Sequence, residues 1–170
     1  MTIVVEDGSE VTGANSYVTL DEARDYASAR GVTLPAADSE LEPLAHLAMD
    51  FLKAYDARYV GNLMTSTQPL PWPRKNAYIN GFLFANDDIP SQIKEAQKLL
   101  IMVQHQGATL FAPLTATTSG TVKREKVGPI ETEYAEPYYG GEVRDVAIIR
   151  ALDMVLNAIT RPVSLNVYRA

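Results

Sequence analysis

The sequence contains no cysteine. Disulfide bonds, thiolate metal sites and cysteine nucleophiles are therefore excluded. No apolar run approaches the length of about 18 residues at which a membrane-spanning helix is considered. Residues 1–8 also lack the basic segment and long apolar stretch of a signal peptide. We expect a soluble protein that is not secreted by the usual route.

Motifs for catalysis and cofactor binding are missing too. The chain has no Gly-x-Gly-x-x-Gly, no Gly-Lys-Ser/Thr phosphate loop and no Gly-x-Ser-x-Gly elbow. His46 and His105 lack a second imidazole at metal-ligand spacing. The adjacent Asp87 and Asp88 precede an expected helix, where capping explains them better than acid–base chemistry does. We expect no enzyme activity, no cofactor and no metal.

Acidic residues outnumber basic ones, which gives a formal net charge of −6 and a pI of about 4.9. This balance disfavours phosphate-backbone binding as the main activity, although it leaves room for a local basic patch. The chain has nine tyrosines, but Tyr134, Tyr138 and Tyr139 lie among glutamates that would repel phosphates. Structural roles for the tyrosines are therefore favoured over stacking on bases.

Helical periodicity and capping signals predict four helices. Thr19 and Glu22 have capping-box spacing, and Ser39 and Glu42 repeat it. Trp72 lies between two prolines of an irregular middle segment and is expected to bury its ring there. The fold class predicted is mainly α, a four-helix bundle-like core with one β-hairpin excursion and extended N- and C-terminal segments. The helices are expected at about 20–30, 39–59, 89–106 and 143–159.

We expect one domain over residues 1–170, because the length suits a single compact core. Its helical core would comprise about 19–110 and 142–160, followed by a C-terminal arm at 161–170. A linker and hairpin would occupy about 112–141.

The clearest single element is a charged hairpin within residues 121–134. With Gly128 and Pro129 in the loop, Val127 faces Ile130, and two oppositely charged pairs follow, Lys126 with Glu131 and Arg124 with Glu133. Such a hairpin either packs on its own domain or projects as an arm that pairs with a neighbouring subunit or partner. The candidate interface residues here are Lys123, Arg124, Glu125, Lys126, Glu131 and Glu133.

The C-terminal segment, residues 163–170, alternates apolar and polar residues as a strand does. It could add to a sheet edge of another chain, pair with residues 3–5, or fray as a terminus. Its candidate interface residues are Val163, Leu165, Val167, Tyr168 and Arg169.

Several strings resemble, in order and spacing, the head-tail connector (adaptor) proteins of tailed bacteriophages, whose members are often labelled DnaT-like single-stranded DNA-binding proteins. The strings are Val-Glu-Asp-Gly at 5–8, Val-Thr-Gly-Ala-Asn-Ser-Tyr-Val at 11–18, Leu-Pro-Trp-Pro-Arg at 70–74, Asp-Ile-Pro at 88–90 and Val-Lys-Arg-Glu-Lys-Val-Gly-Pro-Ile at 122–130. The resemblance spans most of the chain.

The resemblance implies a non-enzymatic virion protein, assembled in the host cytoplasm, that forms a ring, expected to be dodecameric, in the neck under the portal. Its partners would be the portal protein, an adjacent neck or tail component and other copies of itself, with no membrane contact. Residues 123–133 would lie at a ring interface or line the DNA channel, and residues 163–170 would dock on the portal. DNA would pass an acidic channel wall without sticking. The alternative is a DnaT-like single-stranded DNA-binding protein in replication.

Overall fold

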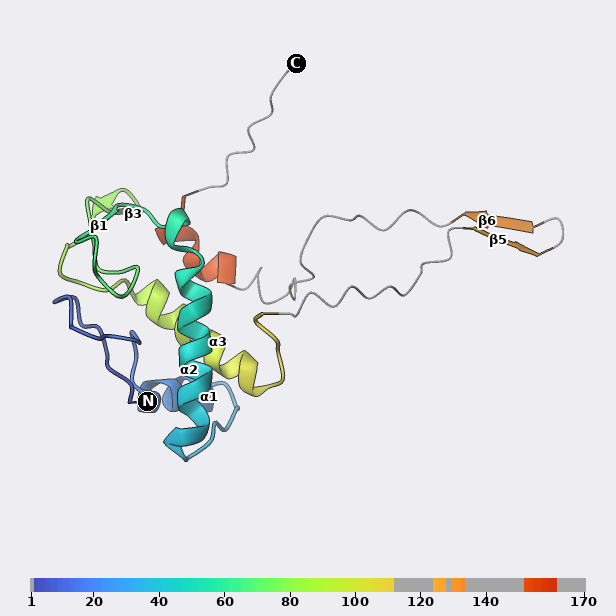
Figure 1. Cartoon of the computed structure of the whole chain (residues 1–170), viewed down its shortest axis with the longest axis horizontal. Helices are drawn as coiled ribbons and strands as arrows, with labels where there is room; N and C mark the ends of the chain where they lie inside the picture. The colour runs from blue at the N-terminus through green and yellow to red at the C-terminus, as the bar shows by residue number, and fades with distance from the viewer. Residues whose placement is uncertain (1, 112–123, 128–129, 134–151, 162–170) are drawn as a thin grey trace, which may run out of the picture.

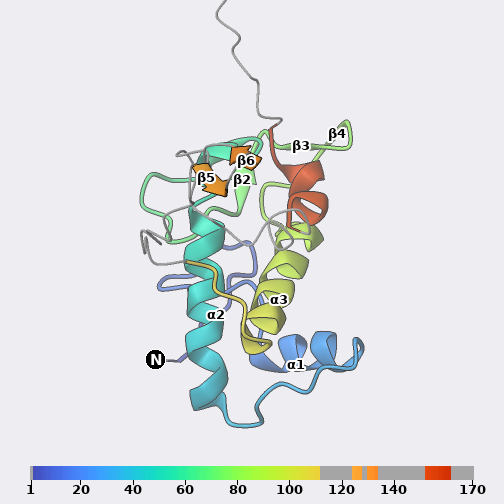
Figure 2. The ribbon, with the colours of Figure 1, turned by 90° about the vertical axis from the view of Figure 1, so that its right-hand side faces the viewer.

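The computed structural model describes residues 2–111, 124–127, 130–133 and 152–161. Two helices form its centre, since α2 (Asp38–Lys53) and α3 (Ser91–His105) pack side by side. The shorter α1 (Leu20–Ser28) lies across one end of this pair and contacts both helices, as Figures 1 and 2 show. The predicted capping box forms at α1, where Thr19 and Glu22 each accept a hydrogen bond from the other's backbone N–H.

In the part of the chain that the structure describes, the opposite end of α2 and α3 is built from short strands, 3₁₀ turns and the helical residues 152–156 (Figure 2). A helical turn at 152–156 runs into a 3₁₀ turn, η2, which contacts β3. The strands pair antiparallel, β1 with β2 and β3 with β4. The bounds are η1 Asp56–Arg58, β1 Asn62–Leu63, β2 Arg74–Lys75, β3 Tyr78–Ile79, β4 Phe82–Leu83 and η2 Asn157–Ile159.

The predicted four-helix bundle is therefore wrong, and the described residues have a mixed α/β architecture. With nine residues, α1 is about 14 Å long, too short to run beside the 16-residue α2, so it crosses the helix ends instead. The irregular middle segment also forms two small sheets, where we predicted none. Nor does Ser39 cap α2, because the helix begins one residue earlier, after Ala37.

The hairpin prediction is confirmed in its register. Strands β5 (Arg124–Val127) and β6 (Ile130–Glu133) pair antiparallel, with Val127 opposite Ile130. Lys126 lies opposite Glu131 and Arg124 opposite Glu133 at the Cα level. The linker, the segment before residue 152 and the C-terminal arm beyond residue 161 lie outside the described residues, so the domain boundaries stay predictions.

The N-terminal loop is tied to the helices by buried polar contacts. The side-chain oxygen of Gln97, on α3, accepts the backbone N–H of Tyr17 at 2.8 Å, and its nitrogen donates to the Ser16 hydroxyl at 2.7 Å. The Tyr17 hydroxyl then accepts the backbone N–H of Trp72 at 2.9 Å. Trp72 is fully buried, as predicted. The segment around Trp72 is therefore fixed in two ways, by the hydrogen bond of its backbone to Tyr17 and by the burial of its ring in the core.

Candidate functional site

Four cationic residues meet at the end of the molecule opposite α1. We call them the basic turn: Arg58, Arg74, Lys75 and Arg161. They come from η1, from β2 and from the residues after η2, which are distant in sequence. Backbone pairing brings these segments together, because the Arg161 N–H donates to the Arg58 carbonyl at 2.6 Å and the Val60 N–H donates to the Ile159 carbonyl at 3.0 Å.

Arg74 organises the basic turn from inside. Its side chain is 8% exposed, and its guanidinium donates to an Asp56 carboxylate oxygen at 2.7 Å and to the Pro71 carbonyl at 3.3 Å. A further N–H reaches the Gly61 carbonyl at 3.4 Å, a carbonyl that also accepts from Arg161 at 3.4 Å. The charge of Arg74 is thus used within the fold, where it fixes the turn.

Gly61 permits this arrangement. Its φ is +74°, and a Cβ there would lie 2.7 Å from the Lys75 carbonyl oxygen, so no other residue fits without moving β2. Close approach of the backbone at Gly61 lets Asn62 pair with Lys75. The exposed Lys75 side chain reaches the Met64 carbonyl at 3.4 Å.

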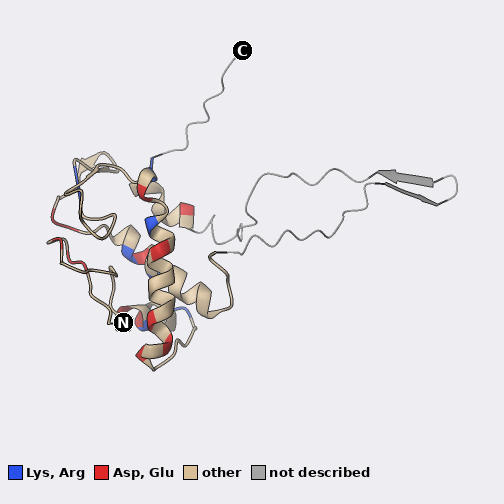
Figure 3. Ribbon diagram, in the orientation of Figure 1, with Lys and Arg blue, Asp and Glu red and all other residues tan. Residues whose placement is uncertain are grey.

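Two cations of the turn remain available to a ligand. Lys75 and Arg161 are exposed, and within the described residues neither forms an ion pair. Arg58 is half-exposed and lies 3.3 Å from Asp153. Charge is also polarised along α2, whose first turn carries Asp38 and Glu40 and whose last turn carries Lys53 (Figure 3). Acids lie at this end as well, since Asp56 pairs with Arg74 and Asp153 with Arg58, so among the described residues the cations of the basic turn without an ion pair are Lys75 and Arg161.

Beneath the basic turn lie two fully buried aromatic rings, those of Tyr59 and Trp72. The ring of Tyr59 lies 6.0 Å from the Arg74 guanidinium and packs edge-on against Trp72. Burial raises the pKa of Tyr59 far above its ordinary value, and burial raises the pKa of Tyr17 in the same direction. These phenols stay neutral at any physiological pH and serve packing rather than proton transfer.

Beside the basic turn is a second feature, the apolar hairpin formed by β3, β4 and the turn Asn80–Gly81. Tyr78, Phe82 and Leu83 are 60%, 79% and 63% exposed. Tyr78 pairs with Leu83 on one face, while Ile79, the cross-strand partner of Phe82, is buried. The hairpin thus shows apolar side chains to solvent on both of its faces.

A small pocket opens near the end of α2. We call it the proline pocket, with a volume of about 200 Å³. Its wall is aliphatic on one side, and Lys53 and Asp56 stand on the other. The lining residues are Lys53, Asp56, Leu63, Gln68, Pro69, Leu70 and Pro71.

The residues singled out from the sequence do not join this site. Arg124, Glu125 and Lys126 lie in β5, and Glu131 and Glu133 in β6, so their strand positions are as predicted. Their role at an interface stays a prediction. Lys123 and the arm residues Val163, Leu165, Val167, Tyr168 and Arg169 lie outside the described residues.

The basic turn and the apolar hairpin were both missed. Asn80-Gly81, flanked by Tyr-Ile and Phe-Leu, is a strong hairpin signal that the sequence did offer. The basic turn has no comparable signal, since Arg58, Arg74 and Arg161 are brought together only by folding.

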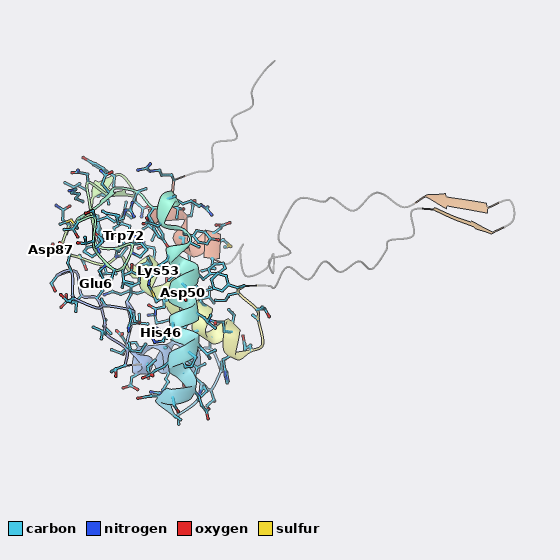
Figure 4. The ribbon with its side chains drawn as sticks, in the orientation of Figure 1. Glu6, His46, Asp50, Lys53, Trp72 and Asp87 are labelled. Carbon is cyan, nitrogen blue, oxygen red and sulfur yellow. The ribbon has the colours of Figure 1, made fainter. Side chains whose placement is uncertain are left out.

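Other chemistry finds no support in the described part of the chain. No group of three or more His, Cys, Asp or Glu side chains there could hold a metal ion. His46 lies on α2 one turn before Asp50 (Figure 4), with no second imidazole beside it. Asp88 accepts the Ile89 N–H at 2.7 Å, but α3 begins at Ser91, after Pro90, with no side-chain cap, so the predicted capping by Asp87 and Asp88 is wrong. Among the described helices, none has the length and apolarity needed to cross a membrane.

Comparison with known families gives one match. A family model described as "putative DnaT-like ssDNA binding protein" matches residues 1–170. No curated protein and no solved structure matches the chain. The match agrees with the label attached to the resemblance noted above and gives no support to the connector family itself.

Proposed function

Because the chain belongs to the family of DnaT-like single-stranded DNA-binding proteins, we propose that it binds single-stranded DNA through phosphate contacts at the basic turn. The observation that carries the proposal is that Lys75 and Arg161 are both exposed and, among the described residues, have no ion-pair partner, while Arg74 and Gly61 hold their two segments together. Exposed Lys and Arg side chains are the groups by which proteins commonly contact phosphates.

The charge count sets the strength of binding. Lys75, Arg161 and the half-exposed Arg58 can reach two or three phosphates, which predicts a salt slope of about −1.4 to −2.1 for a single strand. Raising salt from about 50 to about 200 mM would then weaken binding about sevenfold to eighteenfold. Net charge of −6 adds general repulsion, so we expect weak binding that is seen best at low salt.

A titration of a fluorescently labelled oligothymidylate, followed by anisotropy, tests the proposal. The double variant Lys75→Gln/Arg161→Gln should lose most of the affinity and reduce the magnitude of the salt slope by about 1.4. Arg30→Gln/Lys98→Gln is the matched control, because it removes two cations that lie over the ring of Tyr26, away from the basic turn. Tyr26 is on α1, Arg30 follows that helix and Lys98 is on α3. Equal losses in the two double variants, or no binding by the unmodified protein at low salt, would refute the assignment.

A second candidate function is the virion connector, favoured by the β5–β6 hairpin. Its register sets Lys126 against Glu131 and Arg124 against Glu133, so the strands pair locally and a hairpin of this kind can serve as an arm between subunits. In this proposal residues 123–133 contact a neighbouring copy in a ring, and residues 163–170 dock on the portal. The chain would then join the capsid to the tail, and DNA would pass without being held.

Sedimentation velocity of the protein mixed with its cognate portal ring separates the two candidates. A connector would add mass to the portal boundary in proportion to the number of portal subunits. Deleting residues 163–170 should abolish this gain while the far-ultraviolet circular dichroism stays helical. A protein that ignores the portal but binds the oligonucleotide would refute the connector candidate.

A further inference from the structure

The apolar hairpin is unusual for a surface segment. Tyr78, Phe82 and Leu83 are all exposed, and residues 76–86 include no charged side chain. Clustered exposed apolar groups of this kind mark interaction sites on soluble proteins. The uncharged tip offers no cation to a phosphate, while its aromatic rings suit either a base or an apolar protein pocket, and the test below separates these two uses.

The proline pocket is a hollow, whereas the tip of the apolar hairpin is an exposed projection. Leu63, Pro69, Leu70 and Pro71 give it an aliphatic wall, and two of these residues are prolines with fixed backbones. Its volume of about 200 Å³ is below that of pockets for drug-sized ligands, and suits one large side chain. Gln68 keeps the wall in place, because its amide nitrogen donates to the Leu70 and Pro73 carbonyls at 2.7 and 3.0 Å.

The two features do not meet within one chain. Phe82 is 79% exposed, so it does not occupy the pocket of its own molecule. Figure 2 shows β4 and the end of α2, where Lys53 lines the pocket, on different sides of the strand-rich end. From this complementarity we propose that the apolar hairpin of one copy inserts Phe82 into the proline pocket of a second copy.

Charge supports a second copy as the occupant. The exposed Asp87 and Asp88 follow the apolar hairpin, whereas Lys53 lines the proline pocket. Lys75 is close to the pocket, because its amine donates to the carbonyl of Met64, the residue after the pocket residue Leu63. Asp56 also lines the pocket, but its carboxylate is held by Arg74 at 2.7 Å. Figure 4 shows Asp87 and Lys53 at separate places on one molecule. These two opposite charges can therefore meet only between two copies.

This contact is heterologous, since each copy contributes a different surface. After two copies join, one hairpin and one pocket are still unoccupied, and further copies can add. Assembly therefore continues past a dimer, to a closed ring or an open chain, according to the rotation between copies. The inference goes beyond DNA binding and does not depend on it.

The test uses two variants that each remove one half of the contact. Phe82→Ser/Leu83→Ser removes the apolar tip and leaves the pocket, and Leu63→Arg blocks the pocket and leaves the tip. Unmodified protein should associate beyond dimers in sedimentation equilibrium. Each variant alone should have an association constant lower by a factor of about thirty or more, which is the usual effect of losing a central aromatic contact. Mixing the two variants should restore association, but only to one-to-one dimers.

Met154→Ser is the matched control, because Met154 is 82% exposed on another segment and should not matter. Circular dichroism and the melting temperature check that each variant is folded. Protein that stays monomeric up to about 1 mM, or variants that associate normally, would overturn the proposal. So would a mixture of the two variants without dimers. Loss of oligonucleotide binding in Phe82→Ser/Leu83→Ser, with association unchanged, would assign the hairpin to DNA instead.

Discussion

Glu6 offers the sharpest test of how this chain holds its fold. Its carboxylate is 1% exposed and accepts three backbone hydrogen bonds in the N-terminal loop. One oxygen accepts the N–H groups of Gly8 at 2.8 Å and Glu10 at 3.0 Å, and the other accepts that of Val11 at 2.9 Å. A buried acid so surrounded serves as an internal acceptor rather than as a surface charge.

The change Glu6→Gln keeps the shape of the side chain and removes its charge. One amide oxygen can still accept from Gly8 and Glu10, but the new NH₂ group faces the Val11 N–H, and two donors cannot pair. Losing one charge-assisted bond costs about 1.5–3 kcal/mol, and weakening the other two costs about 1 kcal/mol more. We therefore expect the free energy of unfolding to fall by about 3 kcal/mol.

Urea unfolding followed by the fluorescence of Trp72, the single tryptophan, measures this change. Asp7→Asn is the matched control, because Asp7 lies in the same loop but is exposed, and its carboxylate accepts the nearby Ser9 N–H at 3.0 Å. It should shift the midpoint much less. A Glu6→Gln midpoint equal to that of Asp7→Asn would refute the acceptor role.

Three further predictions concern the same fold. Tyr17→Phe should lower the free energy of unfolding by about 1–3 kcal/mol in urea, because the buried Trp72 N–H loses its acceptor. Thr19→Ala should cost about 1 kcal/mol in the same assay, since it removes the α1 cap from Glu22. Stability should fall above about pH 10, by about 1.4 kcal/mol per pH unit for each of Tyr17 and Tyr59, because the unfolded chain loses phenol protons that the folded chain keeps. Unfolding curves at increasing pH check this, and Tyr17→Phe should flatten the dependence.

Local signals predicted local structure well. The capping box at Thr19 and the register of the β5–β6 hairpin could both be derived from neighbouring residues, because each depends on a contact across a few positions. The turn at Asn80–Gly81 was equally readable and was missed, since the prolines around Trp72 led us to expect an irregular segment.

Contacts between residues far apart in the chain could not be predicted, because the signals in the sequence extend over only a few positions. The crossing of α1 over the ends of α2 and α3 is set by its length and by contacts such as Gln97 with Tyr17, which are 80 residues apart. Likewise, Arg161 meets Gly61 across 100 residues. No pattern within a short window encodes such pairs, so the bundle was the wrong extrapolation and the basic turn stayed hidden.

The strings that carried the resemblance turn out to serve the fold. Glu6 accepts the loop N–H groups, and Gly8, with φ of +112°, leaves room for the Asp87 carbonyl oxygen, which a Cβ would approach to 2.1 Å. Tyr17, Trp72 and Arg74 join the loop, the core and the turn. The exposed groups of both proposals, Lys75 and Arg161 for DNA and the apolar hairpin for self-association, lie outside those strings. The strings within 5–18 and 70–74 therefore hold the fold together, and the activity has to be decided at the surface.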